Sequence, residues 1–134
     1  MLEYKKLFDY IIYFEDENIQ YCQWVNVELG EKGTQILPYP KYDNKLLEFI
    51  QAVYDSGIMM DDYVIYFKDR IGSSSDVISV IQNTNEFDIL RAVLTYYVRQ
   101  ERFQEGLWGK AAEDKIFLTI LLKMRDLNLE KKDF

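Results

Sequence analysis

The segment that constrains the fold most is the run from Glu86 to Gln104, which is long, rich in apolar residues and free of glycine and proline. When each residue advances by about 100°, as in an α-helix, the polar side chains fall in one narrow sector. These are Asp88, Arg91, Thr95, Arg99 and Arg102. A helix that is apolar around the rest of its girth is surrounded by other elements. The sequence therefore predicts a central helix near residues 86–104.

Apolar residues at helical spacing predict further helices on both sides of this one. They are expected near residues 2–14, 44–56, 62–70, 76–81 and 107–127, the last with a break near 114–115. Between the first two, the apolar period changes to two and Gly30–Gly33 offers turn residues, which allows a small β-hairpin near residues 24–37. A lone hairpin is marginal in water, so it must lie against helices. We expect an all-α or mainly α fold, one compact domain of five to seven helices over residues 1–134.

Composition excludes several classes of site. The chain has no histidine and one cysteine, which excludes Ser-His-Asp and Cys-His catalysis, imidazole metal sites and thiolate zinc clusters. A net charge of −7 makes nucleic acid an unlikely partner. The chain shows neither an export signal nor a membrane span. We expect a cytoplasmic protein that has no membrane partner, no metal and no cofactor.

The last turn of the predicted central helix holds two acids, Glu101 and Glu105, on its buried side. A buried carboxylate must be paired, hydrogen-bonded or protonated. All five arginines lie after residue 62, so Arg99, Arg102 and Arg125 are expected partners, together with backbone amides of the following turn.

Two interpretations of this region follow. In the first, a polar pocket grips a small ligand, with the arginines on an anion and Trp108 as an aromatic wall. Its residues are Arg99, Glu101, Arg102, Glu105 and Trp108. In the second, the same residues form a salt-bridged helix corner in which Gly106 supplies a positive φ and Trp108 fills the core. The second is the more common arrangement.

Other polar groups give weaker indications. Glu101 and Glu105 are candidates for an acid/base pair, although this spacing is common on helices. Asp61 and Asp62, with Asp55 nearby, could bind Mg²⁺ or Ca²⁺ but are better explained as helix N-caps. Cys22 has mostly acidic neighbours, which would raise the pKa of its thiol, and is more typical of a packing residue.

Aromatic residues concentrate in the first half of the chain, where nine of the eleven tyrosines precede Phe67. Four of them are candidates for a partner-binding patch: Trp24, Tyr39, Tyr42 and Tyr54. The alternative is that tyrosines cover the edge of a small core. The acidic first half could also imitate DNA, but its acids are scattered among lysines.

The run from Tyr97 to Trp108 resembles the R-x-E-R-F-x-[ED]-G-x-W signature of a bacterial family of domains of unknown function, DUF6508. Ala111-Ala112, Ile116–Leu118, Phe49–Gly57 and the Tyr-Pro-x-Tyr motif at residues 39–42 extend the resemblance over most of the chain. Lys115 stands where the family pattern suggests glycine, which argues against a sharp break before the last helix. The resemblance implies a small, mainly helical bacterial domain and no established reaction.

Two functions remain open. The preferred one is a non-catalytic interaction or regulatory module that binds a protein partner or forms a homo-oligomer. The alternative is a small-molecule-binding domain or an enzyme, with its pocket at the end of the central helix.

Overall fold

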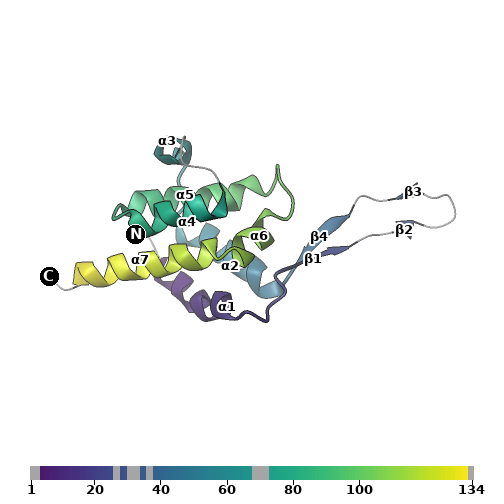
Figure 1. Ribbon diagram of the computed structural model, residues 1–134, viewed down its shortest axis with the longest axis horizontal. Coiled ribbons are helices and arrows are strands. Elements are labelled where there is room, and N and C mark those ends of the chain that lie inside the picture. Colours follow the sequence, from purple (N-terminus) through teal and green to yellow (C-terminus); the bar gives the residue numbers. More distant parts are fainter. Residues whose placement is uncertain (1–3, 26–27, 30–33, 36–37, 68–72, 133–134) are drawn as a thin grey trace.

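The computed structural model describes residues 4–25, 28–29, 34–35, 38–67 and 73–132. In this part of the chain, a 3-10 helix and seven α-helices form a helical body, and a pair of antiparallel strands extends from it (Figure 1). The fold class predicted from sequence is confirmed. Among the described residues, no helix has the length and apolar character needed to cross a bilayer.

The N-terminal half of the body begins with the 3-10 helix η1 (Tyr4–Tyr10), which continues into α1 (Ile11–Glu15). The second long element is α2 (Asn44–Ser56), which matches the helix predicted near residues 44–56 and buries Leu46, Phe49, Ile50 and Val53. Gly57 follows the helix and has a positive φ of 74°, which allows the left-handed turn that commonly closes a helix.

The C-terminal half contains α3 (Tyr63–Phe67), α4 (Ser74–Asn83), α5 (Phe87–Gln100), α6 (Leu107–Glu113) and α7 (Ile116–Lys132). A capping box starts α4, because the Ser73 hydroxyl accepts from the Asp76 amide and the Asp76 carboxylate accepts from the Ser73 amide. Helix α3 covers part of the helix predicted near residues 62–70, and residues 68–70 of that prediction lie outside the described residues.

Helix α5 is the predicted central helix. Eight of its fourteen residues are buried, including Thr95, and it packs against α3, α6 and α7. It ends at Gln100 rather than at Gln104. The prediction was too long because residues 101–104 form turns, and Phe103, assigned to the apolar face, has 73% of its surface exposed.

One continuous core joins the two halves. At its centre Phe14, Phe49 and Phe117 bring α1, α2 and α7 together, with ring centroids 4.9–5.7 Å apart. Between α6 and α7 the helical conformation is interrupted at Lys115, which has a φ of 66°. The expected break is therefore present without a glycine, and the Lys115 ammonium donates to the Phe14 carbonyl at 3.1 Å.

The hairpin is longer than predicted. Strand β1 (Cys22–Val25) pairs with β4 (Tyr39–Tyr42), and β2 (Glu28–Leu29) pairs with β3 (Thr34–Gln35), so paired residues run from 22 to 42 instead of 24 to 37. Pro40 opposes Trp24 in this ladder, a position open to proline because each strand of a two-stranded pair is an edge. Figure 1 shows β1 and β4 beside the helical body and β2 and β3 beyond them. The expectation that the whole hairpin lies against helices is wrong for its outer part.

Candidate functional site

The turn between α5 and α6 is built around Gly106. Its φ is 92°, a conformation that glycine adopts without steric cost. A Cβ added there would lie 2.6 Å from the Trp24 ring, so β1 approaches the turn too closely for a side chain. A second close approach follows at Gly109, where a Cβ would meet the Cβ of Cys22 at 2.5 Å. These contacts fix the base of the hairpin against α6.

The carboxylate of Glu101 is held by three donors. Its Oε1 accepts from the Tyr42 hydroxyl at 2.5 Å and the Trp108 amide at 3.0 Å, and its Oε2 accepts from the Gly106 amide at 3.0 Å. The Tyr42 oxygen also accepts from the Gly106 amide, at 2.9 Å. Amides in the first turn of a helix lack intrahelical partners, so Glu101 satisfies the start of α6 while Tyr42 ties it to β4.

This arrangement differs from the predicted one. Glu101 makes no ion pair with an arginine among the described residues; backbone amides and a tyrosine from a distant strand take that role. Glu105 is exposed, and so are Arg102 and Arg125. The prediction that both carboxylates point into the core is wrong for Glu105, because the helix ends before the rotation that would bring it inward.

Burial is the main cause of the pKa shifts around Glu101. It raises the pKa of Tyr42 well above its usual range, and the hydrogen bond to Glu101 raises it further. Burial also raises the pKa of the Cys22 thiol, with smaller contributions from Glu101 and Glu113. Cys22 thus stays protonated at neutral pH and packs on Gly109, in agreement with the packing role predicted for it.

Two arginines lie beside this network. The Arg99 guanidinium contacts the Asp61 carboxylate at 3.0 Å and sits 5.8 Å from the centre of the Tyr63 ring. The Asp61 side chain is 98% exposed, so this ion pair is screened by water and contributes little to stability. The Arg102 guanidinium lies 4.8 Å from the centre of the exposed Phe103 ring and makes no ion pair within the described part of the chain.

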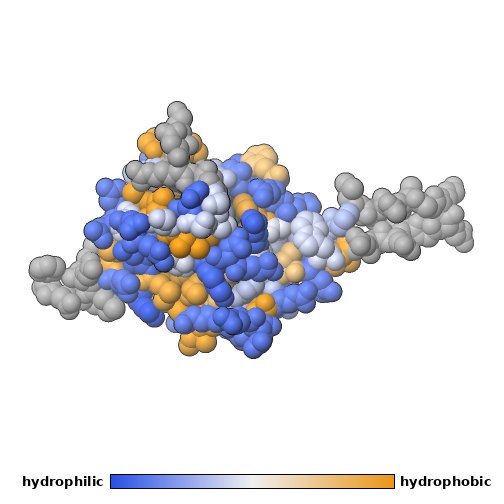
Figure 2. All heavy atoms as spheres, viewed as in Figure 1, coloured by the Kyte–Doolittle hydropathy of each residue, from blue (hydrophilic) through white to orange (hydrophobic). Residues whose placement is uncertain are grey.

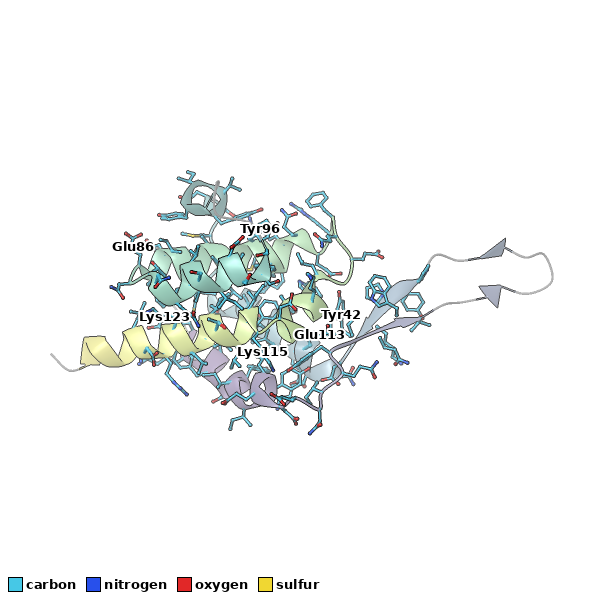
Figure 3. All side chains as sticks on the ribbon, viewed as in Figure 1. Tyr42, Glu86, Tyr96, Glu113, Lys115 and Lys123 are labelled. Atoms are coloured by element: carbon cyan, nitrogen blue, oxygen red, sulfur yellow. The ribbon has the colours of Figure 1, made fainter. Side chains whose placement is uncertain are left out.

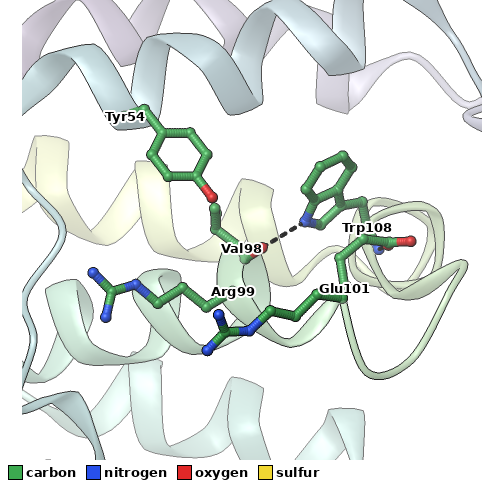
Figure 4. Close-up of a pocket in the computed structure, with 6 residues that line it drawn as sticks. Tyr54, Val98, Arg99, Glu101 and Trp108 are labelled. Atoms are coloured by element: carbon green, nitrogen blue, oxygen red, sulfur yellow. Dashed lines mark hydrogen bonds between the residues drawn. The ribbon is translucent and has the colours of Figure 1, made fainter.

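A pocket of about 500 Å³ opens between α2 and the end of α5 (Figure 4). Its described lining consists of Tyr54, Val98, Arg99, Glu101, Arg102 and Trp108. The Trp108 indole is fixed there, since its N–H donates to the Val98 carbonyl at 3.0 Å and its ring lies 5.3 Å from that of Tyr42. Figure 4 shows Tyr54 and Trp108 on one side of the pocket and the Arg99 side chain on the other.

The structure thus brings together four of the five residues predicted for a pocket: Arg99, Glu101, Arg102 and Trp108. Glu105 is not among the described lining residues, and this separates it from Glu101 as an acid/base partner. Asp61 contacts Arg99, and Asp55 accepts from Gln51. Within the described ranges, no three His, Cys, Asp or Glu side chains gather in a way that could hold a metal ion.

The four residues predicted for a partner-binding patch do not share one surface. Opposed residues of an antiparallel pair lie on one face and alternate along the strand, so Trp24 and Tyr42 share the face turned to α6, whereas Tyr39 lies on the opposite face. Tyr42 points from β4 toward the helical body (Figure 3). Tyr54, on α2, belongs to the pocket.

Sequence reasoning missed three features of the site. Val98 was not named as a pocket residue, Tyr54 was assigned to a partner-binding patch, and Tyr42 was not linked to Glu101. The strand register places Tyr42 opposite Cys22, and no local pattern reveals that a residue 59 positions from Glu101 will reach it. In the sequence, the feature that could have identified Val98 as a pocket residue is its position directly before Arg99, at the end of the helix.

Comparison with known proteins gives one match. A model described as a family of unknown function, DUF6508, matches residues 2–130 and confirms the family resemblance. No curated protein and no solved structure matches the chain.

Proposed function

The chain belongs to the DUF6508 family, whose function is unknown, and we propose that it is a non-catalytic binding module that holds an anionic group of its ligand in the pocket at the end of α5. One observation carries this proposal. Both oxygens of the Glu101 carboxylate already accept hydrogen bonds from Tyr42, Gly106 and Trp108. Arg99 and Arg102 line the same pocket, and within the described chain the Glu101 carboxylate forms no ion pair with either of them.

The guanidinium groups suit this role. Arginine presents planar donors that match the oxygens of a carboxylate or phosphate. The Arg99 guanidinium also lies near the Tyr63 ring and makes an exposed ion pair with Asp61, and an anion can displace that ion pair at little cost. A pocket of about 500 Å³ lies within the usual range for small-molecule sites.

A catalytic role receives less support from this geometry. A general base needs a free acceptor within reach of its substrate, and Glu101 uses both oxygens to hold the α5–α6 turn. Cys22 has a raised thiol pKa, and so it is a poor nucleophile.

A protein partner or a second copy of the chain is the second candidate, favoured by exposed aromatic residues. Trp24 is 52% exposed on β1, and Tyr39 is exposed on β4. Hydrophilic residues cover much of the helical body seen in Figure 2, with apolar residues between them. Tyr39 lies on the face turned away from α6, so replacing Tyr39 by serine should leave folding intact, and it should change the mass measured by light scattering if that face mediates self-association.

Titration calorimetry with methyl phosphate and acetate tests the anion site. We expect saturable binding to the wild type and its loss in the double variant Arg99→Gln/Arg102→Gln, because both donor groups are removed. Asp61→Asn should bind more tightly, because it releases Arg99. Arg125→Gln is the matched control, since it removes an exposed arginine on α7. No binding by the wild type, or equal weakening by Arg125→Gln, would contradict the proposal.

A further inference from the structure

The residues that line the pocket define the class of ligand more narrowly than the charge of the pocket does. The pocket places aromatic side chains, Tyr54 and Trp108, opposite the Arg99 side chain (Figure 4). We infer that its ligand is an organic anion that carries a flat ring, with the anionic group on the arginines and the ring against Tyr54 and Trp108. This inference rests on the proposed anion-binding function.

Size is the first argument. An inorganic anion such as phosphate would occupy a small part of a pocket of about 500 Å³ and would leave the apolar lining in contact with water. Small-molecule sites normally bury most of their ligand against apolar and aromatic walls, with a few polar groups that fix its orientation. Tyr54 and Trp108 supply that apolar lining.

The second argument is how firmly the two aromatic rings are held and how exposed they are. Trp108 is held rigidly, because its indole N–H and its backbone amide both donate hydrogen bonds to the end of α5. Tyr54 is 52% exposed and so retains ring surface that a ligand can cover. A fixed ring and an accessible one offer faces for stacking or edge contacts, which favour a flat aromatic group over an aliphatic one.

The arrangement of charge is the third argument. Arg99 and Arg102 flank Glu101 at the end of α5, where Arg102 is exposed and the Arg99 side chain is 32% exposed. A ligand whose anionic group binds these arginines therefore keeps that group near water, where desolvation costs less. A ligand bound in the reverse orientation, with its ring on the arginines, would place its anionic group beside the Glu101 carboxylate.

The test compares phenyl, cyclohexyl and methyl phosphate by titration calorimetry on the full chain. All three carry the same anionic group, so differences report the part of the ligand that is not charged. We expect phenyl phosphate to bind about tenfold or more tightly than methyl phosphate, as burial of one ring predicts, and more tightly than cyclohexyl phosphate. Tyr54→Ala should lower the affinity for phenyl phosphate and leave that for methyl phosphate unchanged.

Tyr39→Ala is the matched control, because Tyr39 is an exposed tyrosine on the strand face turned away from α6. Equal affinity for the three phosphates would overturn the ring inference and leave the anion site intact. Equal affinity for the phenyl and cyclohexyl compounds would show an apolar pocket without selectivity for flat rings, and would also overturn the inference. Binding of none of them would contradict the proposed function itself.

Discussion

At the scale of single residues, the site depends on how one carboxylate is satisfied. The sequence indicated that an acid near residue 101 needs compensation, and the structure supplies it through Tyr42 and the amides of Gly106 and Trp108. Hydrogen bonds to a charged acceptor are stronger than those between neutral groups. Glu101 is thereby a structural anchor, and its neighbours Arg99 and Arg102 remain available for a ligand.

Replacing Glu101 by glutamine tests this anchor. The amide group of glutamine can accept at its oxygen only, so its NH₂ would face one of the three donors that now meet a carboxylate oxygen. We expect the free energy of unfolding to fall by about 2 kcal/mol, measured by urea denaturation. Glu105→Gln is the matched control and should have no effect, because Glu105 is exposed. Equal stability of the two variants would show that Glu101 anchors nothing.

Gly106→Ala tests the close approach of the hairpin to the turn. The substitution forces alanine to a φ of 92° and places its Cβ against the Trp24 ring. Positive φ at alanine and the clash together should lower stability by about 1–3 kcal/mol. In a Trp24→Ala background the clash is gone, so the same change should cost less. Additive effects in this cycle would contradict the packing of Trp24 on Gly106.

At the scale of elements, the sequence predicted most helices because their signals are local. The apolar spacing of α2, the capping box of α4 and the break before α7 were all recognisable. The end of α5 was not, because residues 101–104 contain no glycine or proline that would end a helix, and the turn there depends on Tyr42 and Trp24 of the hairpin. The faces of the hairpin depend on its register, and the sequence left this register open.

The break between α6 and α7 gives a prediction for Lys115. Its positive φ of 66° is costly for a residue with a side chain, while its ammonium bonds to the Phe14 carbonyl. Lys115→Ala and Lys115→Gly both remove that bond, but only glycine relieves the backbone. The glycine variant should therefore be more stable than the alanine variant by about 1 kcal/mol, in thermal or urea unfolding. The reverse order would exclude the left-handed conformation.

The Tyr42 hydroxyl links β4 to the α5–α6 turn, and this link makes the free energy of unfolding depend on pH in the alkaline range. The pKa of Tyr42 is raised in the folded state, whereas in the unfolded chain it is about 10. Its contribution is thus fully present below pH 10 and is lost as the pH rises above that value. Tyr42→Phe should lose less stability than the wild type between pH 9 and 11, by urea denaturation at each pH. Tyr13 has a raised pKa for similar reasons, so some loss should remain. Identical pH profiles would contradict the link.

At the scale of the whole molecule, two residues of the predicted aromatic patch, Tyr54 and Tyr42, lie at or beside the predicted pocket. The helical body brings Tyr54 of α2 to the arginines of α5, and the hairpin brings Tyr42 beneath them. The sequence identified most of these residues but could not group them, because grouping depends on the packing of α2, α5 and the strands. The resulting pocket combines net positive charge with aromatic walls in a chain whose net charge is −7.

The most direct test of this account is an NMR titration of the arginine side chains with phenyl phosphate. Each Nε–H signal would be assigned from its loss in the corresponding glutamine variant. We predict saturable shifts for Arg99 and Arg102, which line the pocket, and unchanged signals for Arg91, whose Nε–H donates to the Ile58 carbonyl, and for Arg125 on α7. Unchanged Arg99 and Arg102 signals, or equal shifts of all four, would contradict an anion site at the end of α5.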